Sequence, residues 1–300
     1  MIYTLTINPS IDYVMEVGEL KKGAMNRSTN TCLLPGGKGI NVSQVLYALG
    51  IENTAILPVA GFTGEKLLRL LEEKNITADP LKIEQGDTRI NVKVLGKEET
   101  ELNASGLDFT EQDLKRLWEK LEQVKDGDFL ILSGSVPATL GPHFYADIMK
   151  RIQHKKVQVV VDTIGENFLN ALPYKPFLVK PNKEELEDLF QCTIHGQEQL
   201  LKMAKKMQEK GARNVLVSLG GEGAMLLTEV GDVFYEKAPK GKTFNTVGAG
   251  DSMVAGFMAG IIQNRTLQES LKLSVAAGSA SAFSKNLATK EEIDALFKNL

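Results

Sequence analysis

NTVGAGDSMVAGFMAG, residues 245–260, joins a glycine-rich turn to an apolar run with an acid between them. The apolar spacing predicts a helix that begins near Asp251, so the small residues before it would carry bare backbone amides at a helix N-terminus. An acid in a first turn is often only a stabilising cap, worth about 0.3–1 kcal/mol. Small neighbours also allow a phosphate to sit on the amides while the carboxylate accepts a proton from an attacking hydroxyl. Phosphoryl transfer requires those two features side by side.

A second glycine cluster, LPGGKGINVSQVLYALG at residues 34–50, has the same character. Gly39 opens a predicted helix whose N-terminus is a ready anion site, and Lys38 and Asn41 add polar groups there. The spacing does not fit a Walker A loop, and no segment completes GxGxxG. A plain strand-to-helix turn with a solvated lysine explains the cluster equally well.

Composition favours a small ligand over a macromolecular surface. The chain has 300 residues, 43% of them hydrophobic, and a formal net charge of -3. It has no run of like charges, no apolar stretch of membrane-spanning length and no signal-peptide pattern in MIYTLTINPS, so we expect neither nucleic acid nor membrane as a partner. Two cysteines without CxxC spacing favour a reducing cytoplasm over a disulfide or zinc scaffold. The three histidines lie in polar contexts, which indicates solvated surface positions.

Short apolar runs alternate with helical patterns along the chain. The predicted strands are Ile2–Ile7, Ala55–Val59, Phe129–Ser133, Val157–Asp162, Phe177–Lys180, Val215–Leu219 and Ala224–Thr228. The predicted helices are Gly39–Leu49, Gly64–Lys74, Thr110–Gln123, Pro142–Gln153, Lys183–Phe190, Gln197–Lys210, Asp251–Ile262, Leu267–Ser284 and Lys290–Lys298. This alternation predicts an α/β fold with a mostly parallel central sheet flanked by helices on both faces.

Two segments break the alternation and predict a small β-sheet lid. TRINVKVLGKEETEL, residues 88–102, alternates apolar and polar residues before a turn, so we expect a hairpin with one dry face formed by Ile90, Val92 and Val94. Residues 11–32 offer a similar pattern. We therefore expect a single domain over residues 1–300, with a lid formed by about 11–33 and 88–104 inserted in the α/β core.

Three further elements end predicted strands, where open α/β sheets bind ligands. KPNKEEL, residues 180–186, starts a helix with Asn182 as N-cap and Glu185 at the third helical position. VSLGGEGAMLL, residues 217–227, predicts a tight hairpin that needs no ligand. DGDFLILSGSVP, residues 126–137, ends a strand in small and polar residues. Each of these has an ordinary structural explanation when taken alone.

Together these motifs resemble the ribokinase-like, PfkB-type carbohydrate kinases. The resemblance spans nearly the whole chain, through TINPSID, PGGKGINVSQVL, GDTRINVKV, ELNASG, LSGSVP, FLVKPNKEEL and NTVGAGDS. Within the family the sequence is most similar to the branch that phosphorylates ketohexose phosphates, and its motifs are closest to the 1-phosphofructokinases. The resemblance implies ATP and Mg²⁺ as cofactors and transfer of the γ-phosphoryl group of ATP to fructose 1-phosphate, giving fructose 1,6-bisphosphate. Tagatose-6-phosphate kinase and 6-phosphofructokinase activities are the alternatives.

The resemblance also implies roles for individual residues. Asp251 would be the catalytic base, and the amides of Gly248, Ala249 and Gly250 would form an anion hole. The residues implied for the sugar phosphate are Asp12, Arg27, Gly36, Gly37, Lys38, Asn41, Arg89, Asn103 and Ser135, with Lys38, Arg89 and Arg27 as cations for its existing phosphate. The residues implied for the nucleotide are Lys180, Asn182, Glu185, Ser218, Gly220, Gly223, Thr246 and Gly278, with Glu185 holding the metal through water.

A different enzyme class and a non-enzymatic role are the alternatives to the kinase activity that the resemblance implies. A Rossmann dehydrogenase would need a glycine fingerprint after the first strand, and TINPSID supplies none. A nucleotide- or sugar-phosphate-binding regulator on the same fold would be favoured if the acid of GAGD were missing, but Asp251 is present. A lid with an apolar face predicts either a homodimer formed through the lid or a lid packed on its own core.

Overall fold

The computed structural model describes residues 1–300 and has the α/β architecture expected from the sequence. Its central nine-stranded sheet has the order β13-β12-β11-β10-β9-β8-β1-β4-β5, parallel from β11 to β5 with β12 and β13 antiparallel at one edge. The strands are β1 (Ile2–Leu5), β4 (Asn53–Val59), β5 (Ala78–Lys82), β8 (Phe129–Ser133), β9 (Gln158–Asp162), β10 (Leu178–Val179), β11 (Asn214–Ser218), β12 (Ala224–Leu227) and β13 (Val233–Glu236). The antiparallel pair β11–β12 confirms the predicted hairpin.

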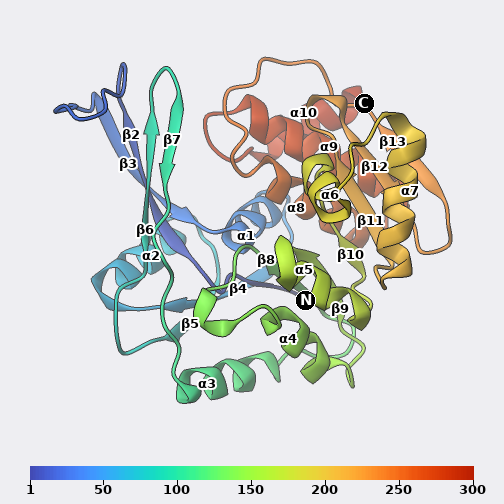
Figure 1. Cartoon of the computed structure of the whole chain (residues 1–300), viewed down its shortest axis with the longest axis horizontal. Coiled ribbons are helices and arrows are strands. Elements are labelled where there is room, and N and C mark those ends of the chain that lie inside the picture. Colours follow the sequence, from blue (N-terminus) through green and yellow to red (C-terminus); the bar gives the residue numbers. More distant parts are fainter.

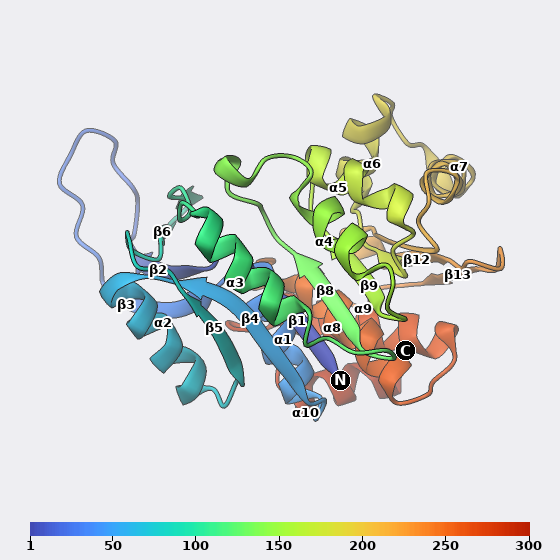
Figure 2. The same cartoon turned by 90° about the horizontal axis from the view of Figure 1, so that it is seen from below.

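Helices cover both faces of this sheet (Figure 2). They are α1 (Lys38–Ala48), α2 (Gly61–Glu73), α3 (Glu111–Leu121), α4 (Phe144–Ile152), α5 (Gly165–Ala171), α6 (Lys183–Phe190), α7 (Gly196–Glu209), α8 (Ala249–Ile262), α9 (Leu267–Phe283) and α10 (Lys290–Asn299). No helix combines the length and the apolar character needed to cross a membrane.

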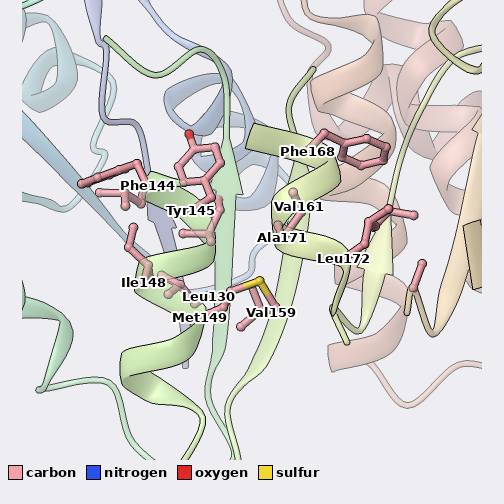
Figure 3. Close-up of a cluster of buried hydrophobic side chains, with 14 of the residues drawn as sticks. Leu130, Phe144, Tyr145, Ile148, Met149, Val159, Val161, Phe168, Ala171 and Leu172 are labelled. Atoms are coloured by element: carbon pink, nitrogen blue, oxygen red, sulfur yellow. The ribbon is translucent and has the colours of Figure 1, made fainter. Parts of the chain in front are cut away.

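Alternation along the central strands produces two large cores, and a third, smaller cluster lies between β4 and α2. Leu130 and Leu132 of β8 belong to the cluster packed against α3 to α7, whereas Ile131 between them belongs to the cluster packed against α1, α8, α9 and α10. Figure 3 shows part of the first cluster, to which α4 contributes Tyr145, α5 contributes Phe168, and β8 and β9 contribute Leu130 and Val161. A strand buried on both faces needs apolar residues at every position, which explains the continuous apolar runs of the sequence.

The segments expected to form a lid make a separate four-stranded sheet that stands away from the central sheet (Figure 1). Its order is β3-β2-β6-β7, with β2 (Ser10–Glu16) antiparallel to β3 (Asn30–Gly36) and parallel to β6 (Ile90–Leu95), and with β6 antiparallel to β7 (Glu99–Leu102). The predicted hairpin is confirmed, but the predicted dry face is wrong at Ile90. Ile90 is 39% exposed and Asn91 only 6% exposed, because Asn91 donates hydrogen bonds to Ser10 and Asp12 of the neighbouring strand.

The sequence patterns missed three short elements. β5 carries Pro80 in its middle, β13 has only four residues and none of them is buried, and α5 spans seven residues. Such segments are too short for periodicity to reveal, and packing against neighbours forms them. The helix expected to begin at Asp251 begins at Ala249 instead, which places Asp251 within its first turn.

Helices α8 and α9 pack closely because small residues line their contact. A methyl group added at Gly256 would lie 2.6 Å from the carbonyl oxygen of Leu273 and 2.9 Å from Cβ of Ala277. The Ser274 hydroxyl donates to the carbonyl oxygen of Met253 at 2.8 Å. This contact aligns the helix that carries Asp251 with the helix that carries Gly278.

Gly256→Ala is therefore expected to lower the free energy of unfolding by about 1–2 kcal/mol, since overpacking outweighs the higher helix propensity of alanine. Chemical denaturation monitored by circular dichroism measures the change. Gly18→Ala is the matched control, because a methyl group there meets no atom within 4 Å. An unchanged or raised stability of Gly256→Ala would contradict the close-packing account.

Candidate active site

One large cavity of about 1190 Å³ lies at the carboxyl ends of the parallel strands. Its wall includes Thr6 after β1, Ser133 at the end of β8, Lys180 after β10 and Ser218 at the end of β11. The lid strands and the first turns of α1 and α8 complete it. Ligands of open α/β sheets bind at this edge, so the cavity is the candidate active site.

Asp251 lies in the first turn of α8 and faces this cavity. Gly248 precedes the helix with φ 79°, a left-handed conformation that favours glycine. The Asp251 carboxylate accepts a 2.8 Å hydrogen bond from the Asn41 side chain of α1, rather than capping its own helix. Burial and then the nearby Asp162 carboxylate raise the pKa of Asp251, and against the opposing effects of Lys38, Asn41 and Lys180 they bring it to about 6. Such a carboxylate is a competent base near neutral pH.

Asp162, at the end of β9, binds two lysines at once. Its Oδ1 lies 3.3 Å from Nζ of Lys38 and 3.4 Å from Nζ of Lys180, and its side chain is only 1% exposed. Burial alone would raise the pKa of Asp162, but the Lys180 and Lys38 ammonium groups hold it below its ordinary value. Asp162 in turn raises the pKa of Lys38 despite burial. Asp162 and Lys38 therefore form a charged pair, and Lys180 adds a second cation to this cluster beside Asp251.

Asp12 marks the opposite, lid end of the cavity. Its Oδ1 accepts hydrogen bonds from the Ser10 hydroxyl at 2.7 Å and the Asn91 amide at 3.3 Å, while its Oδ2 lies 3.1 Å from Nζ of Lys93. Gly36 packs against this carboxylate, and an added Cβ would lie 2.3 Å from Oδ1 of Asp12. Only glycine leaves room for Asp12 in this position.

Arg89 precedes strand β6 and is fixed by backbone carbonyls. Its guanidinium donates to the carbonyl oxygens of Asn8 at 2.8 Å, Ala104 at 3.0 Å and Pro9 at 3.4 Å. A guanidinium carries five N–H donors, so two remain for another acceptor. Nearby, the Asn8 amide donates to the Ser135 hydroxyl at 3.2 Å.

The far end of the cavity is built from β10, α6 and the β11–β12 turn. Asn182 caps α6 and Glu185 completes the capping box, with reciprocal hydrogen bonds of 2.7 and 2.8 Å. This confirms the predicted helix start. The turn Gly220–Glu222 ends at Gly223, where a Cβ would lie 2.0 Å from the carbonyl oxygen of Glu236. The bare turn leaves its backbone facing the cavity.

The structure brings most of the sequence-predicted residues into this cavity and leaves three outside it. Gly36 lies behind Asp12, and the exposed Arg27 lies in the loop between β2 and β3, where no contact links it to the cavity. Asn103 is also exposed and donates only to Glu101. The predicted residues that do line the cavity are Asp12, Gly37, Lys38, Asn41, Arg89, Ser135, Lys180, Asn182, Glu185, Ser218, Gly220, Gly223, Thr246, Gly248, Ala249, Gly250, Asp251 and Gly278.

Sequence reasoning missed several polar residues of the cavity, chief among them Asp162 and Lys93. A signal for Asp162 was present, because an acid ends the buried strand VVVD at the ligand-binding edge. Lys93 belongs to the alternating polar positions of the lid hairpin, which were assigned to solvent. The structure contains no group of three or more His, Cys, Asp or Glu side chains arranged to hold a metal ion, and the three histidines are exposed as expected.

Comparisons with known proteins identify the family. The model of the pfkB family of carbohydrate kinases matches residues 5–294. The chain belongs to this family. It is 42% identical to the 1-phosphofructokinase of Bacillus subtilis, over 99% of this chain and 97% of that protein. It is 33% identical to the D-tagatose-1-phosphate kinase of Bacillus licheniformis, over 98% of this chain and 96% of that protein.

A solved structure supports the same placement. Phosphofructokinase-2 from Escherichia coli, in complex with fructose-6-phosphate, superposes with a TM-score of 0.93 and 30% identity, covering 100% of this chain and 98% of that one. The family resemblance and the enzyme class expected from the sequence, an ATP-dependent sugar-phosphate kinase, are confirmed. The Bacillus licheniformis relative is named for tagatose 1-phosphate, whereas the alternative expected from the sequence was a kinase of tagatose 6-phosphate.

The raised pKa of Asp251 has a consequence for stability. An acid whose pKa rises from 3.8 to about 6 on folding costs stability when ionised, fully above about pH 6 and not at all below about pH 3.8. Asp251→Asn is therefore expected to be more stable than the parent at pH 7.5, by on the order of 2 kcal/mol. The gain should shrink as pH falls from 6 toward 4, as measured by denaturant unfolding at several pH values.

Asp108→Asn is the control for this experiment, because Asp108 is an exposed carboxylate outside the cavity. It should show no comparable gain at either pH. If the effect of Asp251→Asn does not depend on pH, or if the variant is less stable than the parent at pH 7.5, then ionised Asp251 does not lower the free energy of unfolding.

Proposed function

We propose that this kinase transfers the γ-phosphoryl group of ATP in line to the C6 hydroxyl of fructose 1-phosphate, giving fructose 1,6-bisphosphate, with Asp251 as the base. The observation that carries the proposal is the position of Asp251, buried between a fixed cationic cluster and a polar acceptor end. The 1-phosphofructokinase of Bacillus subtilis, 42% identical, supports this acceptor over fructose 6-phosphate or a tagatose phosphate.

In this mechanism Asp251 takes the proton from the attacking hydroxyl. Asn41, which donates to Oδ2, orients the carboxylate and leaves Oδ1 for the acceptor. The first-turn amides of α8 have no carbonyl four residues earlier within the helix, so they can stabilise charge on the transferred group. Gly248 and Gly250 suit this anion hole better than Ala249, whose N–H already donates to the carbonyl oxygen of Thr246 at 3.2 Å.

Lys38 takes a different role from the one its sequence motif implied. It was expected at the existing phosphate of the acceptor, but its ammonium is bound to Asp162 and feels the charges of Asp251 and Glu185. We assign Lys38 and Lys180 to the phosphates of ATP and to the transferred group. Arg89, with two N–H groups left over beside Ser135, is the candidate for the acceptor phosphate.

The residues fit a magnesium ion that is held mainly by phosphates and water. Glu185 uses Oε2 for its capping hydrogen bond, which leaves Oε1 without a hydrogen-bond partner at the cavity wall beside Glu184. Magnesium in kinases binds one or two carboxylates, waters and substrate phosphates rather than a protein cage. The bound ion would neutralise phosphate charge, and Glu185 would hold it through water.

We also infer a lid function, a homodimer and a cytoplasmic location. The four-stranded sheet closes one side of the cavity through Asp12 and Lys93, as a lid over the acceptor would. Its outer strands β3 and β7 each have a free edge, and Leu102 on β7 is 60% exposed. A second copy covering this surface would bury it. Both cysteines are free, as in a reducing compartment.

Asp251→Asn should abolish most turnover while leaving binding intact. The loss of the base is expected to lower kcat by a factor of about 10³, within the usual range for a general base. Steady-state assays with ATP and fructose 1-phosphate measure turnover, and calorimetry measures binding of each substrate. Asp108→Asn, an exposed carboxylate, should keep parental kcat. Turnover of Asp251→Asn within a few fold of the parent would exclude Asp251 as the base.

The acceptor itself is tested by comparing kcat/KM for fructose 1-phosphate, fructose 6-phosphate, tagatose 6-phosphate and tagatose 1-phosphate at saturating ATP and Mg²⁺. Fructose 1-phosphate should lead by at least about tenfold, which corresponds to one well-made charged contact. Chelation of Mg²⁺ should remove turnover on every acceptor, and its return should restore it. A higher kcat/KM for any other acceptor would replace the proposed substrate.

A further inference from the structure

Lys93 is a largely buried cation of the acceptor end that the sequence motifs did not assign. It projects from the middle of β6, its side chain is 12% exposed, and it lines the cavity. Its Nζ lies 3.1 Å from Oδ2 of Asp12 and 3.4 Å from Oε1 of Glu101 on β7. Burial disfavours its charge, but the two carboxylates raise the pKa of Lys93 above its ordinary value. Lys93 is therefore an ammonium with three N–H donors and two partners.

Arg89, Asn91 and Lys93 alternate along the hairpin, so their side chains lie on the same face, the one that carries Asp12. The first two hold most of their hydrogen-bonding groups against the protein, and Arg89 keeps two N–H donors free. Arg89 donates to three backbone carbonyls, and Asn91 donates to Ser10 and Asp12 while accepting from the Ala104 amide at 3.2 Å. Lys93 has only ion pairs, which a ligand can replace.

Asp12 does not depend on Lys93 for its orientation. Ser10 and Asn91 both donate to Oδ1, and Gly36 closes the space behind the carboxylate. Glu101 is the more readily displaced partner, since its side chain is 36% exposed and its contact is the longer one. A swing of Glu101 into solvent would release one donor of Lys93 without disturbing Asp12.

Charge balance indicates what Lys93 would then bind. At the lid end, Asp12 and Glu101 balance Arg89 and Lys93, and at the transfer end Lys38 and Lys180 are tied to Asp162. A phosphate monoester brings about 1.5 to 2 negative charges at pH 7. Displacement of Glu101 alone would leave a net charge of about +1 at the lid end, which such a group more than neutralises. An uncharged sugar brings no negative charge that could replace Glu101 at Lys93.

We propose that Lys93 recognises the phosphate of the acceptor by exchanging Glu101 for a phosphate oxygen, and that it thereby selects phosphorylated over unphosphorylated ketohexoses. This inference rests on the proposed function, since it concerns the acceptor of that reaction. It makes Lys93 a specificity residue that works beside Arg89, with Glu101 as the group that occupies it when no acceptor is bound.

The test compares Lys93→Met with Lys97→Met, which removes an exposed lysine from the turn of the same hairpin. Lys93→Met should lower kcat/KM for fructose 1-phosphate about 30-fold, chiefly through KM, as expected for loss of a charged hydrogen bond. The KM for ATP and the kcat/KM for fructose should change by less than about threefold. Lys97→Met should match the parent on all three measures. Lys93→Arg, which keeps the charge, should recover most of the loss.

Glu101→Gln should change the KM for fructose 1-phosphate in the opposite direction to Lys93→Met. With the competing carboxylate removed, the KM for fructose 1-phosphate should fall about two- to threefold, whereas a purely structural ion pair predicts no change or a rise. Where turnover of fructose is too slow to measure, calorimetric Kd values for fructose 1-phosphate replace it: about 30-fold weaker binding to Lys93→Met supports the proposal, and unchanged binding overturns it.

Equal losses on fructose and fructose 1-phosphate, or a loss confined to kcat, would also overturn the proposal. The proposed function fails separately, if the parent enzyme does not use fructose 1-phosphate. Lys93 is then tested in the same way with the ketohexose phosphate that the parent does phosphorylate.

Discussion

The ion pairs of Asp162 with Lys38 and Lys180 constrain the end of the cavity at which we propose phosphoryl transfer. A carboxylate that is 1% exposed is stable only if opposite charges compensate its lost hydration. Its partners come from the first turn of α1 and the end of β10, so one buried interaction joins three elements far apart in sequence. Asp251 lies beside this cluster, and its raised pKa follows from burial and from the charge of Asp162. Loss of Asp162 would leave two cations without their shared partner.

The two ends of the cavity differ in how firmly their charges are held. At the transfer end the cations share a buried anion, so they need little reorganisation when a phosphoryl group passes. At the lid end Lys93 contacts the more exposed Glu101, an arrangement that a ligand can replace. In the proposed mechanism this difference is useful, because the product must leave the lid end while the cations proposed to act in transfer stay ordered.

Much of this architecture follows from sequence patterns, and the exceptions have physical causes. The alternation of apolar runs predicts the α/β sheet, and Asn182 with Glu185 predicts its helix start, because both depend on local spacing. Asp162 and Lys38 are 124 residues apart in the sequence, so no local pattern reveals that they form an ion pair. Asn91 is buried and Ile90 exposed because Asn91 hydrogen-bonds to Ser10 and Asp12, whereas Val94 on the predicted dry face is buried as expected. Arg27 was chosen because it is a cation, but it lies in an exposed loop, and the residue type does not predict where a loop places a side chain.

The central claim is that Asp251 is a base whose pKa is raised toward neutral pH by burial and by the Asp162 carboxylate. Titration of its carboxyl carbon by ¹³C NMR, in the parent and in Asp162→Asn, tests this most directly. The account predicts a pKa of about 6 in the parent and a lower value in the variant, because Asp162 is a cause of the upward shift. A parental pKa close to the ordinary value of 3.8, or a variant value above the parental one, would contradict it.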